Sequence, residues 1–320
     1  MKMTEPLPRI VFMGTPEFAV ASLRALHKAG CDIAAVVTVP DRPAGRGRKI
    51  TFSPVKEYAL EHDLRLLQPE KLRDPGFIAV MQNLKADMFV VVAFRMLPET
   101  VWKIPPHGTF NLHASLLPQY RGAAPINHAI INGETRTGVT TFLIDSKIDT
   151  GMILLSRETE IYPDENAGSL HDRLMEIGAG LTVETAEGLF AGKLKPVPQK
   201  KIAVTRLKPA PRIFPADTVI NWREPAAKVH NLVRGLSPYP GAMTLLHRGD
   251  SNLRLKILES SLIEDIREIP GFIIKTDGSR LIVSCVSGGI EILSLVPEGR
   301  KRMSGAEFLR GFDPSGWELA

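Results

Sequence analysis

Two short stretches of this chain gather side chains that can do chemistry together. Asn111 and His113 lie two residues apart in a predicted strand, and Asp149 follows in a polar turn further along. Side chains alternate along a strand, so Asn111 and His113 should share one face while Leu112 points to the other. An amide donor, a titratable imidazole and a carboxylate can stabilise an oxyanion and move a proton. We predict that Asn111, His113 and Asp149 are catalytic.

Each of these residues also has a purely structural explanation. Asn111 can satisfy backbone groups at a strand end, and His113 is one of eight histidines, most of which should be structural. Aspartate is favoured in turns by local hydrogen bonding, which would account for Asp149. Only the combination of the three residues favours catalysis.

Signatures of other chemistries are missing from the sequence. There is no G-x-S-x-G, which makes Ser115 a poor candidate for a hydrolase nucleophile. There is also no H-E-x-x-H, C-x-x-C or P-loop. We therefore expect no metal centre and no nucleoside triphosphate chemistry.

The segments that must position these residues indicate an open α/β sheet. Residues 9–14 form a buried-strand pattern, a helical pattern follows with Thr15 as its expected cap, and 33–39 form a second apolar strand. Strand, helix and strand within about thirty residues predict a right-handed βαβ unit and a parallel, Rossmann-like sheet. The first turn carries one glycine, Gly14, rather than G-x-G-x-x-G, so no dinucleotide site is inferred. Such sheets bind ligands beyond the carboxyl ends of their strands.

The chain divides into three predicted parts. Residues 1–191 should form the α/β catalytic domain, and residues 192–211, rich in lysine and proline, should form a linker. Residues 212–320 contain short β-prone runs separated by turn signals, which predict a small barrel or sandwich. We expect an OB-like β-barrel, a shape often used on nucleic acids.

Composition limits the class of protein. Two cysteines far apart exclude a disulfide framework, and no run of eighteen apolar residues or secretory signal occurs, so we expect a cytoplasmic protein with no membrane span. Residues 191–320 hold 20 Lys or Arg against 13 Asp or Glu, whereas residues 1–190 hold 20 against 22. This asymmetry favours a polyanionic partner for the second half. A mildly basic solvated surface explains the charge equally well.

A basic loop at residues 40–49 interrupts the first half of the chain. It contains two prolines, two glycines and four basic residues, Arg42, Arg46, Arg48 and Lys49. Such a loop suits phosphate contacts and folding onto RNA. Composition alone slightly favours an ordinary solvated crossover.

A family resemblance carries the interpretation further. Phe-Asn-Leu-His-Ala-Ser-Leu-Leu-Pro-Gln-Tyr-Arg-Gly-Ala-Ala-Pro-Ile at 110–126 resembles the signature of the folate-dependent formyltransferases, and Asp-Thr-Gly at 149–151 resembles their second motif. Further segments resemble the members of that family that act on initiator tRNA, and they span nearly the whole chain: 10–18, 40–49, 53–56, 221–222, 230–242 and 297–303.

The resemblance implies a reaction. A formyl group would move from 10-formyltetrahydrofolate to the α-amino group of the methionine on initiator methionyl-tRNA, with no obligate protein partner. Asn111 and a protonated His113 would stabilise the negative charge on the formyl oxygen. Asp149 would favour the charged imidazole and help carry a proton from the amine to the departing folate nitrogen.

The resemblance also implies binding residues. The folate-binding segment of the family matches Ser115, Leu116, Leu117 and Pro118. The tRNA contacts would come from the C-terminal domain and from the basic loop, with Arg42 as the strongest candidate and Arg46, Arg48 and Lys49 in support. Arg95 and Lys147 depart from the family pattern near the folate pocket, where they would either contact the glutamate tail or lie on the rim.

Three rival functions stay open on sequence alone. A formyltransferase acting on a sugar nucleotide or on glycinamide ribonucleotide would share the Asn-His-Asp core, although the basic loop and the C-terminal domain favour tRNA. A hydrolase of formyltetrahydrofolate would use water in place of the amine. A non-catalytic RNA-binding protein is the third alternative, and the intact triad argues against it.

Overall fold

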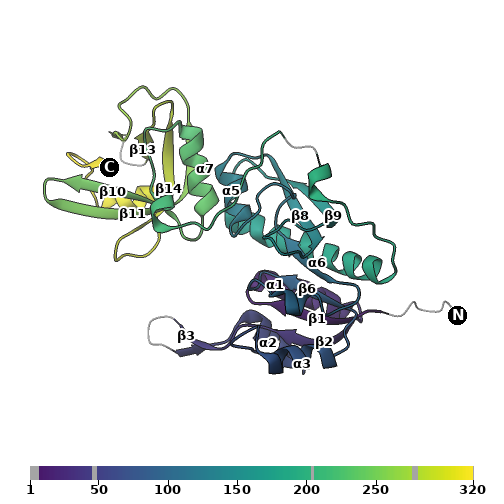
Figure 1. Cartoon of the computed structure of the whole chain (residues 1–320). Helices are drawn as coiled ribbons and strands as arrows, with labels where there is room; N and C mark the ends of the chain where they lie inside the picture. Colours follow the sequence, from purple (N-terminus) through teal and green to yellow (C-terminus); the bar gives the residue numbers. More distant parts are fainter. Residues whose placement is uncertain (1–6, 45–48, 203–204, 276–279, 320) are drawn as a thin grey trace. The chain divides into compact units, whose positions relative to one another are not determined.

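The computed structural model describes residues 7–44, 49–202, 205–275 and 280–319 (Figure 1). The chain forms two compact units. The first consists of Met1–Gly122, Gly138–Thr159 and His171–Lys208, and the second of Ala123–Thr137, Glu160–Leu170 and Pro209–Ala320. All three predicted catalytic residues belong to the first unit.

A seven-stranded sheet with the order β5-β2-β1-β6-β7-β8-β9 forms the centre of the first unit. The pairs from β5 through β7 are parallel, and β8 runs antiparallel to β7. The predicted open α/β sheet is therefore confirmed. The strands are β1 (Arg9–Gly14), β2 (Asp32–Val37), β5 (Leu66–Leu67), β6 (Met88–Val92), β7 (Thr109–His113), β8 (Arg136–Leu143) and β9 (Ile153–Glu160).

Helices cover this sheet on both faces. Val11 and Met13 of β1 share a core cluster with Phe77 of α3 (Pro75–Asn83) and with α4 (Glu99–Trp102). On the other face lie α1 (Glu17–Lys28) and the long helix α6 (Ala167–Phe190), where Ser22 and Thr182 are 3.4 Å apart. The helix α2 (Pro54–Glu61) packs beside α1 and begins with a hydrogen bond to the side chain of its cap, Ser53.

Two local predictions in the first unit need correction. Pro16, not Thr15, is the N-cap residue of α1, and no side-chain hydrogen bond caps this helix. The basic loop is also more regular than its composition indicates, because β3 (Arg42–Ala44) and β4 (Lys49–Thr51) pair as an antiparallel ladder. Proline and glycine in the sequence conceal this ladder, since both residues disfavour strands.

An antiparallel sheet forms most of the second unit. Its order is β12-β13-β14-β11-β10-β16, with β15 paired to β14, and it closes into a nearly complete barrel, which confirms the OB-like prediction. The buried side of α7 (Ala226–Leu236) packs on the core beneath β11 and β14. The remaining elements are α5 (Pro125–Ile131), η2 (Pro215–Thr218), β10 (Ala242–Arg248), β11 (Ser251–Ile263), β12 (Ile273–Lys275), β13 (Leu281–Ser284), β14 (Gly289–Pro297), β15 (Met303–Ser304), α8 (Gly305–Arg310) and β16 (Glu318–Leu319).

None of the helices in the described part of the chain has the length and apolar content needed to cross a bilayer.

Candidate active site

Strand β7 presents Asn111 and His113 at the carboxyl edge of the sheet. Leu112 points to the opposite face, where it packs so closely on Gly178 of α6 that a Cβ there would lie 2.7 Å from a Leu112 methyl group. His113 is 7% exposed and Asn111 is half-buried. The amide of Asn111 has no side-chain hydrogen-bond partner among the described residues, which leaves it available to a ligand.

The imidazole of His113 is held in one orientation. Its Nε2 lies 2.8 Å from the carbonyl oxygen of Tyr120. A carbonyl only accepts hydrogen bonds, so we assign the proton of the neutral ring to Nε2. Nδ1 then faces the Oδ2 atom of Asp149 at 3.8 Å, which is too long for a direct hydrogen bond. Nδ1 is therefore the nitrogen that remains available for proton exchange.

Asp149 lies in a loop that is fixed by close backbone packing. Its Oδ2 accepts a hydrogen bond from the Gly122 amide at 2.9 Å, and its backbone is left-handed, with φ 53°. A Cβ on Gly151 would lie 1.6 Å from the carbonyl oxygen of Leu143, so only glycine fits there. The glycine of the Asp-Thr-Gly motif thus lets the carboxylate loop approach β8 closely enough to bring Asp149 beside His113.

Gln199 joins two loops of the site, and sequence reasoning missed it. Its side-chain amide donates to the carbonyl oxygens of Asp149 and Gly151, at 2.9 Å each. Its side-chain oxygen accepts from Nε and Nη2 of Arg121 at 3.0 and 2.6 Å. Gln199 is only 4% exposed. It lies in the stretch predicted as a linker, where its neighbours gave no signal of burial.

Thr140 of β8 is a second residue that the sequence did not reveal. Its hydroxyl donates to the Ser115 carbonyl oxygen at 2.6 Å and accepts from the Leu117 amide at 3.2 Å. The Ser115 hydroxyl donates to the Gln119 carbonyl oxygen at 2.7 Å. These bonds fix the segment from Ser115 to Pro118, predicted to bind folate, immediately after the end of β7.

The described part of the basic loop is anchored at its base by a buried lysine. Lys56 forms an ion pair with Asp41, and its ammonium lies 3.8 Å from the centre of the Phe52 ring. Gln68 donates to the other oxygen of Asp41 at 2.8 Å. Hydrogen bonds from Lys56 and Gln68 hold the pKa of the Asp41 carboxyl below its usual range. Arg42 is exposed next to this anchor.

The other predicted tRNA-binding residues fall at the edge of what the structure describes. Arg46 and Arg48 lie outside the described residues, and for Lys49 only the backbone in β4 is described. Arg42 is therefore the member of this group whose position the structure defines.

Of the two departures from the family pattern, Arg95 contacts the protein through its side chain, whereas Lys147 bonds through its backbone amide. Nη1 and Nη2 of Arg95 donate to the carbonyl oxygens of Glu70 and Pro69 at 3.1 and 2.8 Å. The buried Nε of Arg95 has no hydrogen-bond partner in the described part of the chain. Burial, and to a lesser extent the nearby Arg42, lowers the pKa of this guanidinium. The Lys147 amide donates to the carboxylate of Asp145 in the exposed turn before Asp149.

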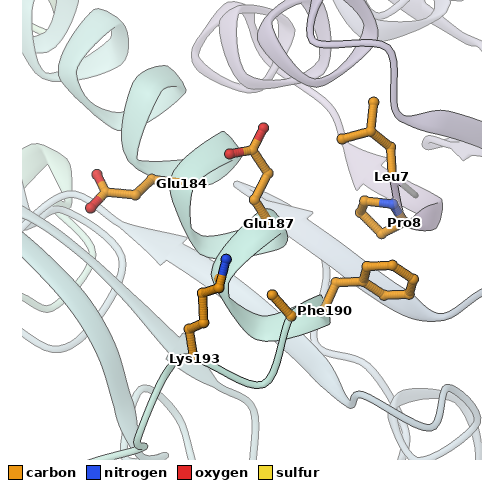
Figure 2. A pocket seen from close by; sticks show the side chains of 8 residues that line it. Leu7, Pro8, Glu184, Glu187, Phe190 and Lys193 are labelled. Carbon is orange, nitrogen blue, oxygen red and sulfur yellow. The ribbon is translucent and has the colours of Figure 1, made fainter. Parts of the chain in front are cut away.

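A pocket of about 660 Å³ lies elsewhere in the first unit, near the end of α6 (Figure 2). Glu184, Glu187, Phe190 and Lys193 line it together with Leu7 and other residues. None of the residues predicted for catalysis is in its lining. The predicted catalytic residues therefore lie apart from this cavity, at the edge of the sheet. Within the described ranges, no three His, Cys, Asp or Glu side chains are grouped to hold a metal ion.

Two family models match this chain. The formyl transferase family matches residues 8–185, which include all three predicted catalytic residues, and the C-terminal domain of formyl transferases matches residues 212–313. This chain belongs to the formyl transferase family. Solved formyl transferases share its fold at low identity. An N-formyltransferase from Helicobacter canadensis, solved with folinic acid and dTDP-3-aminofucose, has a TM-score of 0.64 at 20% identity, covering 89% of this chain and 99% of its own. A sugar 3N-formyl transferase solved with dTDP and 5-N-formyl-THF has a TM-score of 0.65 at 19% identity, covering 92% and 100%.

Other relatives have a much higher sequence identity to this chain than these solved structures do. The methionyl-tRNA formyltransferase of Bacteroides fragilis is 49% identical over 308 residues, covering 95% of each chain. That of Flavobacterium johnsoniae is 48% identical over 303 residues, covering 95% of this chain and 96% of its own. Similarity at this level extends through both units of this formyl transferase.

Proposed function

We propose that this formyl transferase moves the formyl group of 10-formyltetrahydrofolate to the α-amino group of methionyl initiator tRNA. The product is N-formylmethionyl-tRNA, which starts translation in the cytoplasm. Full-length relatives named methionyl-tRNA formyltransferase support the substrate. The observation that carries the chemistry is the approach of Asp149 to the free Nδ1 of His113, with the unpaired amide of Asn111 on the same face of β7.

The reaction forms one C–N bond and breaks another. The neutral methionyl amine attacks the formyl carbon, and the bond from that carbon to N10 of folate then breaks. Negative charge on the formyl oxygen is stabilised by the Asn111 amide and the His113 imidazolium. Neutral His113 takes up the proton lost by the amine at Nδ1, which faces Asp149. The imidazolium formed in this way is the species that stabilises the oxyanion, and it gives the proton to the departing nitrogen as the bond to N10 breaks. Gln199 keeps the Asp149 loop in place while this happens.

The segment from Ser115 to Pro118 is proposed to bind folate. Its backbone is already held by Thr140 and by the Ser115 hydroxyl, so little ordering is needed when the ligand arrives. Folate binding and catalysis then use one continuous stretch, since this segment directly follows β7.

The basic charge of the second half is more localised than expected. Residues 192–211 contain six Lys or Arg and no Asp or Glu, whereas residues 212–320 contain 14 against 13. The barrel itself is therefore almost neutral overall. We propose 1–191 as the catalytic domain, 192–211 as a basic connecting segment that attracts the phosphate backbone, and 212–320 as a tRNA-binding domain that depends on particular side chains more than on net charge.

The reaction is tested by offering labelled 10-formyltetrahydrofolate together with charged initiator tRNA and, in parallel, glycinamide ribonucleotide. Label on the tRNA methionine alone is the expected result. Label on the ribonucleotide, or release of formate without transfer, would contradict the proposed substrate.

The basic loop is tested with Arg42→Ala. The expected result is a higher KM for charged tRNA with an unchanged KM for 10-formyltetrahydrofolate, because phosphate contacts are lost while the folate segment is untouched. Arg73→Ala, an exposed arginine before α3, is the matched control. A raised folate KM in the Arg42 variant would contradict the assignment.

A further inference from the structure

An exposed tyrosine, Tyr239, lies on a constrained loop of the second unit. Tyr239 is 82% exposed, more than any other large apolar or aromatic side chain in the described ranges. It lies shortly after the end of α7, between Pro238 and Pro240 in the sequence. An aromatic ring this open to water has no role in packing the core and is accessible to a ligand.

The backbone on both sides of Tyr239 is fixed. Buried Ser237 accepts a hydrogen bond from the Gly168 amide at 3.1 Å, and the Gly241 amide donates to the Leu236 carbonyl oxygen at 2.8 Å. Each proline locks its own φ, and a residue that precedes proline is restricted to extended conformations. The loop therefore presents the Tyr239 ring with little backbone freedom, which lowers the entropy cost of a contact.

Two cations without partners lie on the adjoining strand. Lys256 packs its aliphatic stem on Gly241, where an added Cβ would lie 2.9 Å from its Cγ. Arg254 is two residues away on β11 and shares the outward face, while Leu255 between them is buried. Within the described ranges neither cation has an ion pair or a side-chain hydrogen bond. Lys256 packs on Gly241, two residues after Tyr239, so positive charge and an open aromatic ring belong to one stretch of the surface. Such a stretch fits a ligand with both a flat apolar face and an anion.

We propose that Tyr239 and Lys256 form a binding surface for an unpaired nucleotide of the RNA substrate. The tyrosine ring stacks on the base, and the Lys256 ammonium pairs with an adjacent phosphate. This inference rests on the proposed function, because it assigns part of the recognition of charged tRNA to the second unit. It also explains how a barrel with almost no net charge can bind RNA.

The test compares Tyr239→Ala, Tyr239→Leu and Tyr239→Phe in the full chain. We expect the alanine and leucine variants to raise the KM for charged tRNA by about tenfold and the phenylalanine variant to restore it, because only an aromatic ring stacks. The KM for 10-formyltetrahydrofolate and the melting temperature should not change. Phe272→Ala, which removes another exposed aromatic ring of the second unit, is the matched control and should leave the tRNA KM unchanged.

Salt dependence tests the cation. Lys256→Met should reduce the slope of log affinity for a short single-stranded RNA against log salt by about 0.7, the contribution of one phosphate contact. A tRNA KM in Tyr239→Ala equal to that of the unaltered protein would overturn the proposal. A drop in melting temperature or a raised folate KM would also overturn it, since the ring would then be packing within the protein. If the unaltered protein transfers no formyl group to tRNA, the proposed function fails instead, and RNA binding still reports on Tyr239 separately.

Discussion

Each unit contains one buried histidine in a polar cluster, and the two clusters differ in what the ring nitrogens face. His113, in the first unit, bonds a carbonyl through Nε2 and turns Nδ1 toward the Asp149 carboxylate. His230, on α7 of the second unit, is 6% exposed and places Nδ1 3.0 Å from the Ser260 hydroxyl. It also bonds to the backbone at Pro163, so neutral partners occupy the ring.

The electrostatic surroundings separate the two histidines further. Burial lowers the pKa of His230, and the nearby Arg234 adds to this effect, while Asp164 opposes it. The charged form of His230 is therefore disfavoured. The comparison shows that burial does not make a histidine catalytic. A free nitrogen next to an anion allows the ring to gain and lose a proton in the presence of a substrate, and on this ground His113 and not His230 is proposed to be catalytic.

The largest expected effect comes from removing each histidine in turn. His113→Gln should lower kcat for formyl transfer by about 100- to 1,000-fold, because an oxyanion donor and the proton carrier are lost. His230→Gln should leave kcat within about threefold and lower the free energy of unfolding by about 1–3 kcal/mol, since it disturbs buried hydrogen bonds. Steady-state kinetics and chemical denaturation measure the two. Equal losses of kcat in the two variants would contradict the proposed difference between His113 and His230.

The next largest effect tests whether kcat depends on the position of Asp149 beside His113, an anion that His230 lacks at its Nδ1. Gly151→Ala should lower kcat by about 100-fold, because a Cβ cannot fit against Leu143 and the carboxylate loop must move. Gly180→Ala on α6 is the matched control, since its Cβ would meet nothing within 4 Å. That change should raise stability by about 0.5–1 kcal/mol through helix propensity. Normal activity in Gly151→Ala would show that the loop position is not critical.

A smaller effect should follow from loosening the same loop. Gln199→Leu removes all four hydrogen bonds that join Arg121 to the Asp149 loop and leaves buried polar groups unpaired. We expect about 1–3 kcal/mol of destabilisation and a fall in kcat of about tenfold. Gln82→Leu, on the exposed side of α3, should change neither quantity. Full kcat in a destabilised Gln199 variant would limit this residue to a structural role.

The smallest expected effect is a dependence of the free energy of unfolding on pH, which should come from His230. The folded-state pKa of His230 lies below its ordinary value of 6.5, so the unfolded chain binds more protons than the folded one below that pH. The stabilisation is complete above about pH 6.5 and is lost as the pH falls toward the folded-state pKa. The free energy of unfolding should therefore decline on acidification, and less steeply in His230→Gln. Equal slopes in the two proteins would contradict this.

The sequence alone predicted the elements whose local pattern is strong. The run 9–14 became β1, the periodic stretch after it became α1, and the apolar run 33–39 became most of β2, because burial in a strand or on one helix face leaves a recognisable local signal. Asn111, His113 and Asp149 were predicted to be catalytic from residue types and from a motif. The position of Asn111 and His113 on one face of β7 followed from strand geometry, which depends only on neighbours in the chain.

The tertiary structure decided the contacts between segments distant in the chain. Three features of the site depend on such contacts: the left-handed turn at Asp149, the approach of Gly151 to Leu143, and the hydrogen bonds of the Gln199 side chain. The residues that these hydrogen bonds join lie up to 78 positions apart. No local pattern encodes such contacts. A glutamine that becomes buried has the same side chain as one that stays exposed, and the residues next to Gln199 give no sign of its burial. The contrast between His113 and His230 arises in the same way. The chain supplies two similar imidazoles, and folding decides which of them meets an anion with a nitrogen free.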